Sequence, residues 1–367
     1  MDTLGTVTAL AQDLVRIDSR SALSNLALAD RLEAELSGFE IERLDYQDAN
    51  GVNKCVLVAA RGRSGLAFSG HMDTVPDTGW QTDPWSGRIE GDTLHGLGST
   101  DMKGPVAAVV AAANALPASV PVALLLTADE ETTKQGARLI ARSSELARRF
   151  APRGILIAEP TGLAPVRGHR SHIEFTAVAT GVQAHSSTGQ GRNANWALVP
   201  FLAAMQQIFD RLRTDPALQD AAYDPVFSDF NPVIDNHGAA VNVTVPKATV
   251  RIKYRHSAGV DPAPVVDAVR EAAAAHGLQL TESREGRPPE LPADHPLVAL
   301  ATNLTGLAPG TAPFGTDASE LQALGPCLVF GPGDLAQAHT PTEQVSLAAL
   351  AAAVPMFMRM ADRVAAG

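Results

Sequence analysis

The sequence predicts an α/β protein that carries an inserted α+β domain. Over residues 1–168, apolar runs that are typical of buried strands alternate with helical patterns, which indicates a largely parallel sheet covered by helices. The pattern changes over residues 169–284 and returns over residues 285–367. A chain of 367 residues is long enough for two domains. We therefore expect one discontinuous α/β domain, residues 1–168 and 285–367, interrupted by a second domain at 169–284.

The first stretch of the α/β domain contains two runs that are apolar throughout. One run ends at Phe68 and the other covers residues 120–127, and strands buried on both faces have this pattern. Residues 103–116 lie between them and are strong helix candidates, whereas residues 77–98 are rich in turn formers and predict a loop. The other elements expected here are helices at 3–15, 25–36 and 133–147, and strands at 40–46, 54–60 and 154–158.

The inserted domain shows patterns with one polar face. Residues 171–180 alternate polar and apolar side chains, which is typical of a strand with one exposed face. Residues 240–245 and 249–254 predict a hairpin that turns at Pro246 and Lys247. The other elements expected in this domain are helices at 193–212 and 261–276 and a strand at 278–281. Where the α/β pattern returns after it, we expect helices at 297–304 and from 346 onward and a strand at 327–330.

Composition argues against several classes of protein. The chain has 40 acidic and 29 basic residues and a net charge of −11, with no block of lysine and arginine, so we expect neither nucleic acid nor an anionic membrane as a partner. The N-terminus lacks the basic and apolar segments of a secretion signal, and no apolar run reaches about 18 residues. Two cysteines provide neither a disulfide framework nor a thiolate zinc cluster. We expect a cytoplasmic protein.

The stretch LAFSGHMDTVP, residues 66–76, offers the first polar side chains at a strand end. His71 and Asp73 are two residues apart and therefore point to the same side of an extended chain. A histidine that binds metal usually needs its other ring nitrogen held by an oxygen acceptor, which Asp73 can provide. A pair of this kind taken alone is more typical of a loop or a surface.

Further candidates follow other strands or open helices. Asp101 precedes a helix, Glu130 and Glu131 follow the strand at 120–127, Glu159 follows the next strand, and His339 lies after the last. Because sites in open α/β sheets form at the carboxyl ends of strands, these side chains can converge. Taken singly, each also has an ordinary structural explanation. Asp101 could cap a helix, Glu130 and Glu131 could be acidic residues in the first turn of a helix, Glu159 could be a loop residue, and His339 could be an exposed histidine. The G-x-G of Gly96 and Gly98 is not a dinucleotide fingerprint, because Asp101 replaces its third glycine.

Together the candidates have the composition of a two-metal site. Two histidines and three carboxylates, one of them bridging, suit two zinc ions about 3.5–4 Å apart. A carboxylate that binds no metal is then needed to take a proton from water and pass it to a leaving amine. The adjacent Glu130 and Glu131 can divide these two roles between them.

The motifs SGHMDTVP, GLGSTDMKG, TADEET, AEPT, GVQAHSS and GPGDLAQAHTPTE, in this order, resemble one known family. It is the co-catalytic zinc family of acetylornithine deacetylase, succinyl-diaminopimelate desuccinylase, aminoacylase-1 and the glutamate carboxypeptidases. The resemblance extends over nearly the whole chain. It implies a zinc-peptidase catalytic domain with an inserted dimerisation domain.

The resemblance also implies roles for individual residues. It places His71 and Glu159 on one zinc ion, Glu131 and His339 on the other, and Asp101 between them. Asp73 is expected to orient His71, and Glu130 to act as general base and acid. The peptide bond after the bridging aspartate is cis in relatives, so the bond between Asp101 and Met102 is expected to be cis. The resemblance implies that His185 acts from the partner subunit on the oxyanion. The other residues implied to contact substrate are Asn242, Arg255, Gly315 and Thr316.

The function expected from this resemblance is removal of the acyl group from N-acyl-L-amino acids by a homodimer with two zinc ions in each subunit, although cobalt or manganese also suits these ligands. The residues of these motifs most resemble those of acetylornithine deacetylase. A carboxypeptidase on acyl-glutamate or dipeptides is the alternative, and a metal-binding dimer without activity is another. Two departures bear on specificity: Ser171 stands where relatives commonly have glycine, and the segment after Arg255 lacks their Arg-Pro-Leu-Pro ending.

Overall fold

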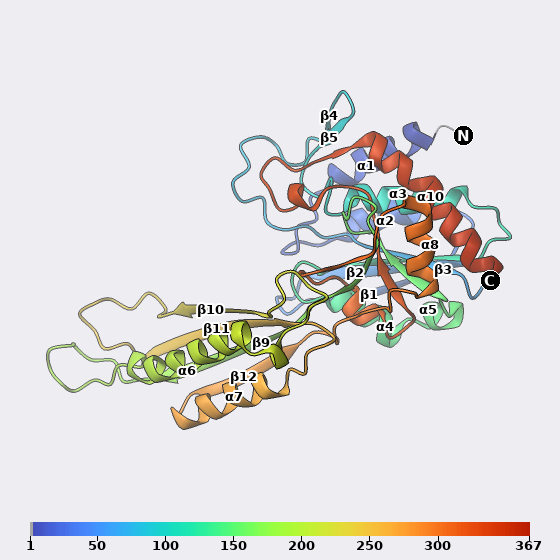
Figure 1. Ribbon diagram of the computed structural model, residues 1–367. Helices are drawn as coiled ribbons and strands as arrows, with labels where there is room; N and C mark the ends of the chain where they lie inside the picture. The colour runs from blue at the N-terminus through green and yellow to red at the C-terminus, as the bar shows by residue number, and fades with distance from the viewer. Residues whose placement is uncertain (1–2) are drawn as a thin grey trace. The chain divides into compact units, whose positions relative to one another are not determined.

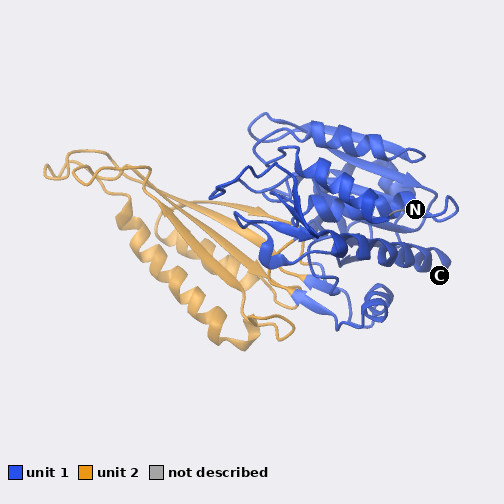
Figure 2. Cartoon of the chain, turned by 90° about the horizontal axis from the view of Figure 1, so that it is seen from above, with its two compact units in different colours: residues 1–168, 289–311, 316–367 blue, residues 169–288, 312–315 orange. Residues whose placement is uncertain are grey.

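The computed structural model describes residues 3–367, and the contacts within it divide the chain into two units (Figure 2). Unit 1 holds the residues up to Gly168 together with Pro289–Thr311 and Thr316–Gly367, and unit 2 holds His169–Pro288 and Ala312–Gly315. The domain limits expected from sequence, 169–284 for the inserted part, remain a prediction beside this contact-based division. The predicted fold class, α/β with an inserted α+β part, is confirmed.

Unit 1 is built on an eight-stranded sheet. Its central strand β3 (Leu66–His71) pairs in parallel with β6 (Val122–Thr127) and β7 (Gly154–Ile157), and all three are fully buried. Because parallel neighbours end at the same edge, the segments that follow these strands meet there. The order is completed by β1 (Glu40–Gln47), β2 (Asn53–Arg61), β14 (Cys327–Val329), β8 (Val166–His169) and β13 (Gly310–Ala312), as β1-β2-β6-β3-β7-β14-β8-β13.

Helices cover both faces of this sheet, which explains the uninterrupted apolar strands (Figure 1). In β3, Phe68 packs toward the helices of one face and Ala67 toward those of the other. The helices on the Phe68 face are α1 (Thr3–Val15), α2 (Leu26–Glu35), α3 (Lys103–Ala115), α8 (Pro296–Thr305) and α10 (Leu347–Ala366). Those on the Ala67 face are α4 (Gln135–Ser143), α5 (Glu145–Phe150) and α9 (Ala318–Leu321).

Two predicted elements of unit 1 differ in the structure. The helix expected at 133–147 is broken at Ser144, whose backbone is extended and whose hydroxyl caps the second helix by accepting from the N–H of Ala147. The loop expected at 77–98 contains the short strands β4 (Arg88–Glu90) and β5 (Thr93–His95). The strand β5 also pairs with β15 (Gln344–Ser346), a partner far along the chain that no local pattern reveals.

Unit 2 is a four-stranded antiparallel sheet with two helices packed on it. The strand order is β10 (Asp229–Asp235), β11 (Lys247–His256), β9 (Ser171–Thr180) and β12 (Gln279–Arg284). The apolar positions of β9 and β11 pack against α6 (Asn195–Thr214) and α7 (Ala263–Ala275). Alternation of buried and partly exposed residues in β9 confirms the one-sided pattern read from the sequence.

The hairpin expected at 240–254 is wrong. Residues 240–245 form no strand, and β11 pairs instead with β9 and with β10. The sequence of β10 contains Pro232, which concealed it; proline is tolerated because β10 stands at the edge of the sheet. Among residues 3–367, no helix combines the length and apolar character needed to span a bilayer.

Candidate metal centre

Three strand ends bring the first candidates together. His71 is the last residue of β3, the pair Glu130 and Glu131 follows β6, and Glu159 follows β7, all at the same edge of the sheet. His71 is buried, and its Nε2 lies 3.1 Å from Oδ1 of Asp101, which precedes α3. The peptide bond between Asp101 and Met102 is cis, as the resemblance implied.

Asp101 lies between the two histidines. Its Oδ1 faces His71, and its Oδ2 lies 3.2 Å from Nε2 of His339. The same Nε2 of His339 lies 3.1 Å from Oε1 of Glu131. Ligand atoms of His71, Asp101 and Glu131 all lie within 4.8 Å of one another, which is close enough to share a metal ion. One oxygen of Asp101 toward each imidazole is the arrangement that a bridging carboxylate needs.

The electrostatics of this cluster fit bound cations. Burial raises the pKa of Glu131 to about 7 against the opposing hydrogen bond from His339, and burial followed by the charge of Asp101 raises the pKa of Glu159 well above its usual range. Hydrogen bonds to Asp101 and Glu131 raise the pKa of His339 to about 11. The raised pKa values of Glu131, Glu159 and His339 indicate that this cluster holds protons more strongly than the same groups do in water, and divalent ions bound to neutral imidazoles would replace such protons.

Asp73 has more contacts than the sequence predicted. Its buried carboxylate accepts the backbone N–H of Glu130 at 3.2 Å and that of Glu131 at 3.3 Å, and the Ser21 hydroxyl donates to it at 2.7 Å. Nδ1 of His71 lies 2.9 Å from the backbone oxygen of Asp73 and 3.7 Å from its carboxylate. Asp73 therefore orients His71 mainly through its main chain, while its side chain holds the two glutamates in place.

Glu130 has the environment expected of a proton carrier. Its Oε1 is buried and accepts no hydrogen bond from any residue within 3–367, and Nζ of Lys134 lies 3.6 Å away. Burial raises the pKa of Glu130, and the positive charge of Lys134 opposes that rise. A carboxylate oxygen that is buried without a hydrogen-bond donor is available to accept a proton.

Comparison with known proteins decides the family. Residues 67–363 match the model of Peptidase family M20/M25/M40. The chain belongs to this family. The acetylornithine deacetylase of Proteus mirabilis is 33% identical over 358 residues, which cover 94% of this chain and 90% of that protein. The acetylornithine deacetylase of Myxococcus xanthus is 32% identical over 363 residues, covering 94% and 93%.

A solved structure of the same family has the same fold. The metallo-carboxypeptidase Sso-CP2 of Sulfolobus solfataricus superposes with a TM-score of 0.74 and 16% identity, and the match covers 100% of each chain. Family membership confirms the resemblance drawn from the motifs. The protein is a metal-dependent amidohydrolase, and the cluster around Asp101 is the candidate group of metal ligands for this family member.

The residues implied to contact substrate are spread over both units. In unit 2, His185 forms an isolated antiparallel bridge with Val243, and the N–H of Ser186 donates to the backbone oxygen of Asn242, so His185 and Asn242 are neighbours. Asn242 and Val243 precede the first residue of β11, whereas Arg255 lies near its last residue and forms an ion pair with Asp229. Gly315 groups with unit 2, whereas Thr316 is buried in unit 1.

Sequence reasoning missed Asp317, the residue after Thr316. The Thr127 hydroxyl, at the end of β6, donates to Oδ2 of Asp317, and Oδ1 has no hydrogen-bond partner within the described chain. Burial, and next the charge of Glu130, raise the pKa of Asp317 to about 8. The motif FGTDASE contained this residue, but nothing in its local pattern indicated that it would be buried beside the strand that leads to Glu130.

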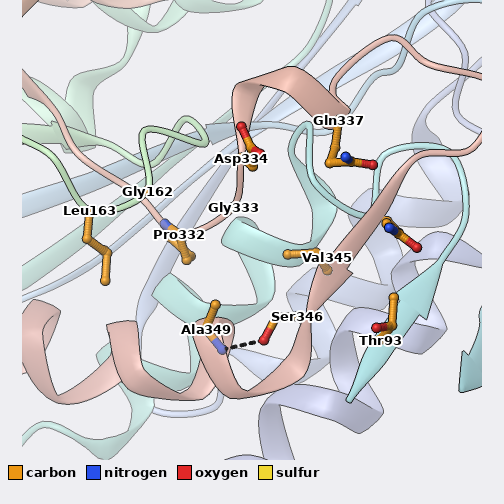
Figure 3. A pocket seen from close by; sticks show the side chains of 11 residues that line it. Thr93, Gly162, Leu163, Pro332, Gly333, Asp334, Gln337, Val345, Ser346 and Ala349 are labelled. Carbon is orange, nitrogen blue, oxygen red and sulfur yellow. Dashed lines mark hydrogen bonds between the residues drawn. The ribbon is translucent and has the colours of Figure 1, made fainter. Parts of the chain in front are cut away.

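Among the cavities of unit 1, two lie near segments that carry the predicted ligands or the start of α10. One, of about 440 Å³, has Glu131 and Asp129 in its wall, together with Ser21, Leu23 and Val75, and so adjoins the candidate centre. The other, of about 350 Å³, lies at the start of α10 and contains none of the predicted ligands (Figure 3). Its labelled lining residues in Figure 3 are Thr93, Gly162, Leu163, Pro332, Gly333, Asp334, Gln337, Val345, Ser346 and Ala349.

Proposed function

We propose that this protein is a two-metal amidohydrolase that cleaves the acyl amide of N-acyl-L-amino acids, with N-acetylornithine and related N-acetyl amino acids as its first candidate substrates. The observation that carries the proposal is the position of Asp101, whose two carboxylate oxygens face His71 and His339, beside the buried Glu130. The two acetylornithine deacetylases at 32–33% identity support this choice of substrate class.

Five residues would hold the metals. His71 and Glu159 would bind one ion, Glu131 and His339 the other, and Asp101 would bind both; zinc is the first candidate, and cobalt and manganese also accept such ligands. Two bound ions would lower the pKa of a water molecule and polarise the acyl carbonyl of the substrate. The donor set fits this role because the buried Asp101 and Glu159, the partly buried Glu131 and two imidazoles bring several negative charges together, which divalent cations would offset.

Glu130 would carry the proton. Its Oε1 would accept a proton from the attacking water and then donate it to the amine nitrogen as the amide bond breaks. Asp73 keeps the main chain of Glu130 in place through the hydrogen bond at 3.2 Å, and Lys134 keeps a positive charge 3.6 Å from the carboxylate. His185 would donate a hydrogen bond to the oxygen that gains negative charge.

We also propose that the active enzyme is a homodimer formed through unit 2. Arg255 and Lys247 are eight residues apart on β11, which corresponds to about 27 Å in an extended strand, and Asn242 lies beyond Lys247. One subunit therefore cannot bring both Arg255 and the pair His185 and Asn242 to the same small substrate. If both act on one substrate, one of them comes from the partner subunit, and we assign that part to His185, as the resemblance implies.

Exposed apolar side chains on unit 2 support this interface. Val233 and Ile234 are about half exposed on the edge strand β10, and Trp196 is 75% exposed on α6. An unpaired strand edge and exposed apolar side chains are typical of surfaces that pair with another chain. The double substitution Val233→Lys, Ile234→Lys should convert the dimer to monomers, as measured by analytical ultracentrifugation. The control Leu307→Lys, at a similarly exposed position on unit 1, should leave the dimer intact.

Mixing two inactive variants tests the exchange of His185 between subunits. A Glu130→Ala chain and a His185→Ala chain would each be inactive alone. In a mixed dimer, one site would combine the intact Glu130 of one chain with the intact His185 of the other, so activity would return on mixing and subunit exchange. A mixture that stays inactive, although mixed dimers are detected by mass spectrometry, would refute action across the interface.

Hydrolysis assays decide between the deacylase and its alternatives. Zinc-loaded protein is tested on N-acetyl derivatives of ornithine, citrulline, lysine and glutamate, on N-succinyl-diaminopimelate and on dipeptides, with a chelator control. A chelator-sensitive preference for an N-acetyl amino acid supports the proposal. Cleavage of dipeptides or acyl-glutamate alone favours a carboxypeptidase. A protein that binds two metal ions and cleaves none of these would favour a metal-binding dimer, which we disfavour because Glu130 and all five ligands are present.

Cytoplasmic location remains a prediction.

A further inference from the structure

Glu343, the last residue of the motif GPGDLAQAHTPTE, is a buried carboxylate that contacts the segment carrying Asp101. Glu343 is 1% exposed, and its side chain accepts three backbone N–H groups. Oε2 accepts from Gly98 at 3.0 Å, and Oε1 accepts from both Thr100 and Asp101 at 2.9 Å. Glu343 therefore holds the main chain of the predicted bridging ligand itself.

The same residue belongs to the loop that carries His339. Glu343 comes four residues after His339, and its backbone N–H donates to Thr340 at 3.3 Å. Its backbone oxygen accepts from Gly96 at 3.1 Å, so both main chain and side chain connect the His339 loop with the Asp101 segment. The next residue, Gln344, adds a further link, because its backbone oxygen accepts the Thr100 hydroxyl at 2.7 Å.

We propose that Glu343 is a positioning residue that fixes the main chain of Asp101 relative to the loop of His339, so that the carboxylate of Asp101 can bind two metal ions. The proposal rests on the proposed function, in which Asp101 is the bridging ligand. A bridging carboxylate must present one oxygen to each ion, and a shift of the main chain at residue 101 would move both oxygens at once. Partners of ligands typically change metal affinity by about 10–100-fold when they are substituted.

The informative variant is Glu343→Gln. Its amide oxygen can still accept from Thr100 and Asp101, but its NH₂ group then faces the N–H of Gly98, donor against donor. Glu343→Ala removes all three acceptor contacts. A matched control is Glu42→Gln, because Glu42 also accepts two backbone N–H groups, from Glu145 at 3.0 Å and Leu146 at 3.1 Å, where α5 begins. None of the predicted metal ligands contacts Glu42 through these bonds.

Metal affinity and spectra provide the readout, independently of activity. Zinc affinity is measured by competition with a chelator, cobalt-loaded protein is compared by its visible absorption, and thermal unfolding and circular dichroism report folding. We expect Glu343→Gln to weaken both zinc sites by about 10–100-fold and to shift the cobalt bands, with a larger effect for Glu343→Ala. Glu42→Gln should keep wild-type affinity and spectrum even if it lowers the melting temperature equally.

The outcomes separate this proposal from the proposed function. If wild-type protein binds two ions and Glu343→Gln binds them with the same affinity and spectrum, the positioning role is wrong while the proposed function stands. If Glu42→Gln weakens metal binding as much, the effect of Glu343 is general stabilisation and the role is again wrong. If the wild-type protein itself binds no pair of metal ions, the proposed function fails first. Should Glu343→Ala fail to fold, the comparison of the two glutamine variants still decides.

Discussion

Replacement of Lys54 by methionine tests the buried charges behind Glu130. Lys54 lies on β2 with its side chain fully buried, and its Nζ lies 3.1 Å from Oδ1 of Asp129 and donates to the backbone oxygen of Ser21 at 2.6 Å. The Tyr46 hydroxyl donates to the other oxygen of Asp129 at 2.7 Å. Asp129 directly precedes Glu130 and has a positive φ of 61°, so its side-chain contacts help to hold a turn at the candidate centre.

The size of the effect follows from this geometry. Methionine can fill the space of the lysine stem but leaves the carboxylate of Asp129 without its cation. Removing one partner of a buried ion pair destabilises a protein by about 3–5 kcal/mol. Tyr46→Phe removes only one hydrogen bond to a charged group and should cost about 1.5–3 kcal/mol. The double variant Lys54→Met, Asp129→Asn removes both charges and should be more stable than Lys54→Met alone.

Urea unfolding, followed by circular dichroism on all variants, measures these differences. Lys247 on β11 is exposed, so Lys247→Met serves as the control and should change the free energy of unfolding by less than about 0.5 kcal/mol. A Lys54→Met protein as stable as the control would show that the buried ion pair contributes little. If the added Asp129→Asn substitution lowers stability further, the uncompensated carboxylate is not the cause of the loss.

Three other predictions follow from the site and the core. Glu130→Gln should retain its metal ions and lower turnover by about 10²–10⁴-fold; retained turnover at full metal content, measured by mass spectrometry, would remove Glu130 from the proton-transfer role. In the metal-free protein, hydrogen bonds, first from Asp101, raise the pKa of His339 to about 11, above the roughly 6.5 of an unfolded histidine. The folded state therefore binds a proton that the unfolded state releases, and this stabilisation is lost as the pH rises from about 6.5 toward 11. Melting temperatures of chelated protein should therefore fall over this pH range more steeply than those of zinc-loaded protein, and parallel curves would contradict the assignment. Phe68→Ala should lower the free energy of unfolding by about 3–5 kcal/mol in urea titrations, because the ring is fully buried between sheet and helices; a loss below about 1 kcal/mol would contradict this packing.

Local patterns predicted the elements of unit 1 well, because strands buried on both faces are apolar throughout and the helices between them are strong helix formers. The same reasoning failed for β10, where a proline within the run conceals an edge strand. It also failed for the partners of β11, because the pairing of β9 with β11 joins residues that are 67 to 85 positions apart and no turn signal specifies it. Strand pairing depends on which surfaces bury each other, and a local window contains no such information.

For the site, the residue types in the motifs indicated the chemistry, and the family confirms the amidohydrolase class. Side-chain type and its place at a strand end are properties of the sequence, so His71, Asp101 and the paired glutamates could be found there. Which atoms meet is a different matter. The structure shows that the main chain of Asp73 lies closest to Nδ1 of His71, while its carboxylate holds the glutamates.

The sequence by itself determined the fold class, the family and the candidate ligands His71, Asp101 and Glu131, because periodicity, composition and motif spacing are local properties. Only the tertiary structure decided that Glu343 holds the main chain of Asp101, a residue 242 positions away, and that His185 and Arg255 lie toward opposite ends of the unit 2 sheet. Such contacts form when distant segments pack together, and their partners are selected by shape, burial and hydrogen-bond satisfaction in the folded chain.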